Sequence, residues 1–211
     1  MRLAIFGAAG GIGRHVVQAA RAAGHELTLV TRDASQLEGV TPADRVLAGD
    51  VLDVALVAEA VEGSDAVINT LGPSSNSPAE VELTEEFTRK LIEAMDAARI
   101  RRLVTLSGAA VSVDGEHKGL GDRFASAVVR VLAGNVLRAK QREYELLAAS
   151  RLEWVAVRPP RVTDDAPRGS YRTGELKVSP GSRIGKADLA AFMLEQLTDD
   201  TYLRQAPLIK Y

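Results

Sequence analysis

The sequence contains no cysteine and only three histidines among its 211 residues. Without thiols, the chain forms no disulfide, offers no thiolate ligand to a metal and has no cysteine nucleophile. His15, His25 and His117 are far apart and lack the paired helical spacing of a metal site. We therefore expect no metal, and the lack of cysteine suits a reducing cytoplasm.

Strong charge of one sign and long apolar runs are also lacking. The formal net charge is -2 at pH 7, which gives no general attraction to nucleic acid or to an anionic membrane surface. The first apolar run, residues 3–6, is too short for a signal peptide, and later runs such as 109–113 are too short to span a bilayer. We expect a cytoplasmic protein whose partners include neither nucleic acid nor membrane.

Short, almost wholly apolar runs alternate with longer amphipathic ones along the chain. Strands covered by helices on both faces have this character, so the pattern predicts an α/β fold. We expect a Rossmann-like doubly wound parallel sheet in three α/β/α layers, formed by residues 1–211 as a single domain. The predicted strands are 3–6, 27–30, 45–48, 66–69, 103–106 and 154–157.

Apolar stripes at helical spacing lie between and after these strands. The predicted helices lie within 11–23, 83–98, 138–150 and 188–197. A stretch rich in proline and serine, 72–78, is predicted to be a loop, which either is a plain surface connection or closes over a ligand. Substrate-loop insertions are expected near 111–135 and 158–185, the latter as an irregular segment.

A glycine-rich turn follows the first predicted strand and opens the first helix. Its glycines permit close approach of a pyrophosphate, and a helix N-terminus supplies unpaired N–H donors there. Because strand, turn and helix occur in the required order, the turn predicts dinucleotide binding. The residues expected to contact the cofactor here are Gly7, Ala9, Gly10, Gly11, Ile12 and Gly13.

The end of the second strand favours NADP(H) over NAD(H). Thr31 stands where a carboxylate would bind the ribose hydroxyls, and Arg32 follows with a guanidinium suited to a 2′-phosphate. Asp33 is a complication, because it lies near the usual offset of a ribose-binding acid. Its alternative role is to cap a short helix that begins near Ala34.

Further cofactor contacts are expected at the ends of the third, fourth and sixth strands. Asp50 is expected to meet the adenine amino group, with capping as its alternative role, and Val51 lies beside it. Leu71 and Gly72 would pass along the ribose or act as plain turn residues. Pro159 is predicted to form part of one wall of the nicotinamide pocket.

These motifs resemble the atypical short-chain dehydrogenase/reductases, the group with NmrA-like, NAD(P)H-binding members. The run from Trp154 to Pro160 and the Lys186-Ala187-Asp188-Leu189 sequence look like the NADPH-dependent flavin reductase/biliverdin-IXβ reductase branch. The resemblance implies an enzyme that passes hydride from NADPH to a loosely held planar acceptor such as FMN, a quinone or a linear tetrapyrrole. It also implies FMN as a substrate rather than a prosthetic group, and a monomer.

The catalytic residues are less complete than the cofactor motif. Typical short-chain dehydrogenases use serine with Tyr-x-x-x-Lys, in which tyrosine gives a proton to the substrate. Ser107 ends the fifth strand and Lys140 can fill the lysine role, but Val136 stands in place of the tyrosine. Tyr144, one turn after Lys140, is the remaining candidate, with helix packing as its alternative.

We therefore expect an NADPH-dependent reductase of a flavin, quinone or related planar acceptor, with Ser107, Lys140 and Tyr144 as catalytic candidates. Ser107 and Lys140 are also expected to contact the cofactor. Hydride transfer to such a ring delocalises charge, so a weak acid/base set suffices. The alternative is a non-catalytic NADP(H)-binding redox sensor of the NmrA-like type that controls a protein partner.

Overall fold

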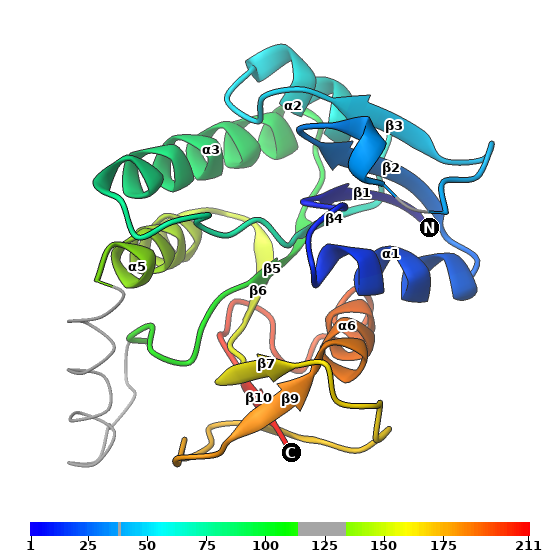
Figure 1. Ribbon diagram of the computed structural model, residues 1–211. Helices are drawn as coiled ribbons and strands as arrows, with labels where there is room; N and C mark the ends of the chain where they lie inside the picture. The colour runs from blue at the N-terminus through cyan, green and yellow to red at the C-terminus, as the bar shows by residue number, and fades with distance from the viewer. Residues whose placement is uncertain (38, 114–133) are drawn as a thin grey trace.

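Six parallel strands form the central sheet of the computed structural model, which describes residues 1–37, 39–113 and 134–211 (Figure 1). Their order is β3-β2-β1-β4-β5-β6, so the chain reverses direction across the sheet between β1 and β4, as in a doubly wound Rossmann-like fold. This confirms the predicted fold class and all six predicted strands. The strands are β1 (Arg2–Phe6), β2 (Glu26–Thr31), β3 (Arg45–Ala48), β4 (Ala66–Asn69), β5 (Arg102–Leu106) and β6 (Glu153–Val157).

Helices cover both faces of this sheet and complete the three layers of a single domain (Figure 1). Side chains of successive strand residues point to opposite faces. Leu3 and Ile5 of β1 accordingly join one buried cluster, while Ala4 and Phe6 join the other. The first cluster packs against α1 (Gly13–Ala22) and α6 (Lys186–Glu195), and the second against α2 (Val54–Val61), α3 (Pro78–Ala97) and α5 (Gly134–Ala149).

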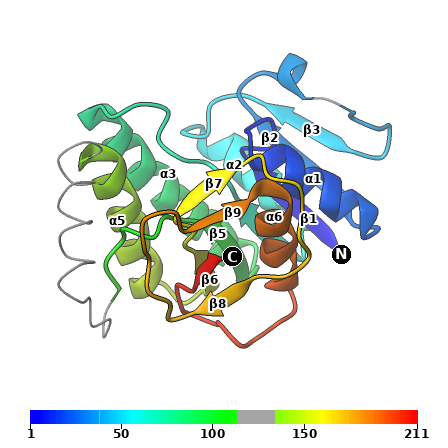
Figure 2. The same ribbon diagram turned by 60° about the horizontal axis from the view of Figure 1, so that its bottom comes forward.

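The prediction of an irregular segment over 158–185 was wrong. This part of the chain forms β7 (Arg161–Thr163), β8 (Arg172–Gly174) and β9 (Arg183–Gly185). β7 pairs with β9, whereas β8 pairs with β10 (Leu208–Lys210) near the C-terminus (Figure 2). Strands of three residues are too short to give a readable alternation of apolar and polar residues, so the sequence pattern missed them.

Two other segments were expected from the sequence, the loop 72–78 and the substrate-loop insertion near 111–135. The loop predicted over 72–78 ends one residue earlier, because Pro78 is the first residue of α3, a position that tolerates a missing N–H. Of the insertion expected near 111–135, residues 114–133, which include His117, lie outside the described residues.

The described residues lack the features of a membrane-spanning helix and of a metal-binding cluster. No helix there combines the length and the apolar character needed to cross a bilayer. The same residues contain no group of three or more histidine, aspartate or glutamate side chains placed to hold a metal ion.

Candidate functional site

The glycine-rich turn leaves the carboxyl end of β1 and is built so that few side chains would fit. Gly7 has a φ of +79°, a backbone conformation that favours glycine. A Cβ atom at Gly13 would lie 2.0 Å from the carbonyl oxygen of Gly7, which is closer than any real contact. The turn therefore requires glycine at both positions, and the backbone stays open to a ligand.

The backbone donors at this turn fit a pyrophosphate. Within the described residues, the N–H groups of Gly11 and Ile12 form no hydrogen bond, and Gly10 and Gly11 are exposed. These groups precede α1, whose N-terminal end carries a partial positive charge. Unpaired donors and the helix dipole thus face the same exposed turn, and phosphate binding there stays a prediction.

Arg14 braces the turn from its outer side. Its Nε atom donates to the carbonyl oxygen of Ala9 at 2.9 Å, and its Nη2 atom donates to the carbonyl oxygen of Gln36 at 3.2 Å. The side chain thus connects the glycine turn with the segment that follows β2. The sequence analysis missed this residue, because an arginine in a first helical turn gives no signal of its own.

At the end of β2, Asp33 acts as a helix cap. Its Oδ1 atom accepts hydrogen bonds from the backbone N–H of Ser35 at 2.9 Å and from the Ser35 hydroxyl at 2.7 Å. The hydroxyl and backbone bonds from Ser35 hold the pKa of this carboxyl below its usual value. Thr31 is buried and donates from Oγ1 to the Asp33 carbonyl oxygen at 3.2 Å, whereas Arg32 is exposed.

The residues after β3 likewise make local caps. Asp50 Oδ1 accepts from the backbone N–H of Leu52 at 2.9 Å, which corresponds to its alternative role. Asp53 caps α2 by accepting from Ala55 N–H at 2.9 Å. The Asp50 side chain is exposed and Val51 is buried, so a contact of either with adenine stays a prediction.

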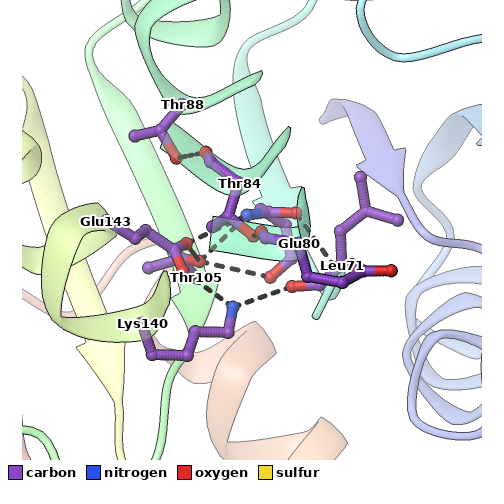
Figure 3. A network of polar contacts seen from close by, with 8 residues as sticks. Leu71, Glu80, Thr84, Thr88, Thr105, Lys140 and Glu143 are labelled. Atoms are coloured by element: carbon purple, nitrogen blue, oxygen red, sulfur yellow. Dashed lines mark hydrogen bonds and ion pairs between the residues drawn. The ribbon is translucent and has the colours of Figure 1, made fainter. Parts of the chain in front are cut away.

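Lys140 belongs to a buried polar network at the ends of β4 and β5 (Figure 3). Its Nζ atom donates to the Leu71 carbonyl oxygen at 2.8 Å and to Glu143 Oε2 at 2.7 Å. Glu143 Oε1 accepts from Thr105 Oγ1 at 2.5 Å and from Asn69 Nδ2 at 3.1 Å. The Asn69 side-chain oxygen in turn accepts from Leu71 N–H at 3.0 Å. The network thus fixes both the ammonium of Lys140 and the backbone after β4.

Glu143 is a second residue of this site that sequence reasoning missed. It is 3% exposed, and Lys140 is 8% exposed, so both charges lie away from water. An ionised pair is tolerated in such a place when each partner is also hydrogen-bonded. The signal was a glutamate three residues after the lysine, which places both on one helix face, but its partners on β4 and β5 are distant in sequence.

The other two catalytic candidates, Ser107 and Tyr144, lie in different surroundings. Ser107 is half-buried at the end of β5, and its N–H donates to the Val157 carbonyl oxygen at 2.8 Å. Tyr144 lies in the core, 7% exposed, with its ring edge-on to Trp154 at 5.8 Å between centroids. The structure therefore brings Lys140, but not Tyr144, into the polar network at the strand ends.

Gly72 and Pro159 flank this region. A Cβ at Gly72 would lie 3.9 Å from the Cε atom of Lys140, so the lysine stem runs beside this turn. Pro159 is buried, and its carbonyl oxygen accepts from Ala109 N–H at 3.1 Å. It therefore links the chain leaving β6 to the segment that follows β5.

Asp188 ties the start of α6 to two other segments. Its carboxylate accepts from the backbone N–H of Arg168 at 2.8 Å, from that of Gly169 at 3.1 Å and from the Tyr211 hydroxyl at 2.6 Å. Burial alone would raise the pKa of this carboxyl, but these donors outweigh it and hold the pKa below its usual value. For Tyr211, burial and then the bond to Asp188 raise the pKa.

A cavity of about 570 Å³ adjoins α5 and the chain that leaves β5. That volume is within the range of small-molecule sites in proteins. Its lining mixes amide, hydroxyl and aliphatic groups, among them Gln141, which follows Lys140 on α5. The lining residues are Asn76, Ala110, Ser112, Gly134, Asn135, Leu137, Arg138 and Gln141.

Solved structures and curated proteins with similar chains agree with this fold. The structure of ChuY from Escherichia coli O157:H7, described as an anaerobillin reductase, superposes with a TM-score of 0.80 at 20% identity, covering 99% of this chain and 96% of ChuY. The uncharacterized protein YwnB of Bacillus subtilis is 27% identical over 203 residues, which is 93% of this chain and 92% of YwnB. A 3-diazoavenalumate denitrifying reductase from a Streptomyces species is 37% identical over 117 residues, 51% of this chain but only 38% of that protein.

The family itself is identified by a match to almost the whole chain. The model of the NAD(P)H-binding family matches residues 7–200, from the first glycine of the turn to beyond α6. This agrees with the unpaired donors of the turn and with the sheet order. The chain therefore belongs to the NAD(P)H-binding family of Rossmann-like proteins.

Proposed function

We propose that this protein is an NADPH-dependent reductase that passes hydride to a planar conjugated acceptor such as a flavin, a quinone or a linear tetrapyrrole. The observation that carries the proposal is the position of its four tyrosines, all within the described residues. Tyr144 packs against Trp154 in the core. The hydroxyls of the other three are bonded to groups other than Lys140 and Ser107: Tyr171 to Glu195, Tyr202 to Thr173 and Tyr211 to Asp188.

Reduction of a simple ketone needs a positioned acid beside the carbonyl oxygen. Among the described residues, neither Lys140 nor the Ser107 side chain has a hydrogen bond with a tyrosine. A conjugated ring spreads the charge that hydride transfer creates and takes its proton from water. The arrangement of side chains therefore favours an acceptor of that class.

When bound, the nicotinamide supplies the hydride, and the side chains of this chain bind and orient. Lys140 has three N–H donors, of which two are used by Leu71 and Glu143, so the third is available to a ribose hydroxyl. Ser107, at the end of β5, offers a hydroxyl to the carboxamide of the nicotinamide. Holding two rings in contact contributes most of the acceleration in such a site.

The preference for NADPH is supported by the end of β2. The Asp33 carboxylate caps the short helix after β2 by accepting two hydrogen bonds from Ser35, which is a role other than binding the ribose hydroxyls. Arg32 is exposed, and its planar guanidinium suits a phosphate. The reductases among the relatives support the reaction class, and we keep a cytoplasmic monomer as part of the proposal.

A non-catalytic NADP(H) sensor is the second candidate, because the absence of a tyrosine bonded to Lys140 among the described residues also suits a protein that binds the cofactor without turning it over. The two functions differ in one measurement. Purified protein is mixed without oxygen with NADPH and, in turn, FMN, menadione, biliverdin and a simple ketone, with NADH in parallel. Saturable oxidation with a ring acceptor and none with the ketone is expected.

Two results would contradict the proposal. Tight binding of NADP⁺ without oxidation by any ring acceptor would favour the sensor. Reduction of the ketone at a comparable rate would mean that a proton donor exists that the tyrosine positions do not reveal. The variant Glu145→Gln, which changes an exposed residue of α5, is the control for purification and handling.

A further inference from the structure

The side chain of Lys186 reaches across to the glycine-rich turn from another part of the chain. Lys186 is the first residue of α6, which packs against α1 on the same face of the sheet (Figure 2). A Cβ atom at Gly11 would lie 3.7 Å from Nζ and 3.8 Å from Cε of Lys186, and would meet no other atom within 4 Å. The ammonium thus lies next to Gly11 of the exposed turn, where the N–H groups of Gly11 and Ile12 are unpaired.

The partner of this lysine is an exposed carboxylate. Lys186 Nζ donates to Asp164 Oδ1 at 2.5 Å, and the two side chains are 26% and 83% exposed. Asp164 follows β7 and makes no other hydrogen bond with the described residues. Ion pairs of this exposure contribute little to stability, so the pair is easily exchanged for a stronger one.

A positively charged side chain would stabilise a pyrophosphate bound at this turn. The turn offers backbone N–H groups and a helix dipole but no charged side chain of its own, and the nearby Arg14 is engaged by two backbone carbonyl oxygens. A hydrogen bond between an ammonium and a phosphate oxygen is among the stronger ones in proteins. Lys186 has the charge, the position and a replaceable partner.

We propose that Lys186 is a cofactor-binding residue: its ammonium leaves Asp164 to contact the pyrophosphate of the bound dinucleotide. Asp164 then holds the lysine over the turn while no dinucleotide is bound and competes with the pyrophosphate for it. This inference depends on dinucleotide binding at the turn and not on the identity of the acceptor, so it stands even if the protein is a sensor.

The test compares two ligands and three variants of the full chain by calorimetric titration. NADP⁺ carries the pyrophosphate, whereas adenosine 2′-monophosphate carries only the 2′-phosphate. Lys186→Met should weaken NADP⁺ binding about ten- to a hundred-fold and change binding of adenosine 2′-monophosphate less than about two-fold. Lys177→Met, which removes an exposed lysine elsewhere, should leave both affinities unchanged.

Asp164→Asn should change the affinity for NADP⁺ in the opposite direction. By removing the competitor it should tighten NADP⁺ about two- to five-fold, the size expected for an exposed ion pair. If the pair only stabilised the fold, both Asp164→Asn and Lys186→Met would weaken binding and lower the unfolding temperature of the free protein. That outcome would overturn the proposal, as would equal losses for both ligands, or a loss with Lys186→Met no larger than with Lys177→Met.

Discussion

Replacing Glu143 tests whether the buried network holds Lys140. In Glu143→Gln the side chain keeps its size but loses its charge. The Lys140 ammonium, 8% exposed, then has no anionic partner and keeps only uncharged acceptors such as the Leu71 carbonyl oxygen at 2.8 Å. Breaking a buried ion pair on one side costs about 3–5 kcal/mol. For a chain of this length, each kcal/mol lowers the unfolding temperature by about 2–4 °C. We therefore expect a decrease of about 6–20 °C.

The assay is thermal unfolding followed by circular dichroism, with two comparisons. Glu145→Gln removes an exposed carboxylate two residues away, whose partner is Arg142 at 2.7 Å, and should change the unfolding temperature by less than about 2 °C. The double variant Lys140→Met with Glu143→Gln strands no charge and should be more stable than Glu143→Gln alone. The network does not hold Lys140 as argued if Glu143→Gln is as stable as Glu145→Gln. The same conclusion follows if the effects of Lys140→Met and Glu143→Gln on the free energy of unfolding are additive in the double variant.

Three further changes address the turn, the cofactor preference and the start of α6. Gly13→Ala should abolish NADP⁺ binding in titrations and destabilise the fold by about 1–3 kcal/mol, because its Cβ would lie 2.0 Å from a carbonyl oxygen; Gly134→Ala, which meets no atom within 4 Å, is the control and should bind normally. Arg32→Ala should weaken NADPH about ten- to a hundred-fold and leave NADH within about two-fold, and equal losses would exclude a 2′-phosphate contact. Because the folded pKa of Asp188 lies below its usual value, its stabilisation is present above about pH 4 and is lost as the pH falls through the folded pKa. The stability gap between wild type and Asp188→Asn should therefore narrow in acid, and a gap in thermal unfolding that does not narrow as the pH is lowered would refute this.

The sheet was predictable because most of its parallel strands are buried on both faces and so appear as continuous apolar runs. The run predicted over 3–6 corresponds to Arg2–Phe6, and its register with β2 and β4 follows from the fold. The same argument fails for β7 to β10. These strands contain three residues each, and their pairing depends on segments brought together by the rest of the fold.

The candidate site divides in the same way between local and distant contacts. The glycine turn and the cap by Asp33 lie within a few residues of their partners, so spacing alone revealed them. Glu143 meets Asn69 across 74 positions in sequence, and Lys186 reaches a turn at the opposite end of the chain. No periodicity or motif connects such residues, and only the packing of α5 and α6 brings them to their places.

The pairing of Lys140 with Glu143 also bears on which reactions the site supports. Where a lysine stands beside a catalytic tyrosine, its charge lowers the tyrosine pKa and makes it a better acid. Here the ammonium is 2.7 Å from a carboxylate, so its field is largely cancelled, and Val136 occupies the position where that tyrosine would stand. Lys140 is therefore left with hydrogen bonding as its means of action. A site of this kind can orient a ribose and a ring, and it suits acceptors whose reduction needs no acid from the protein.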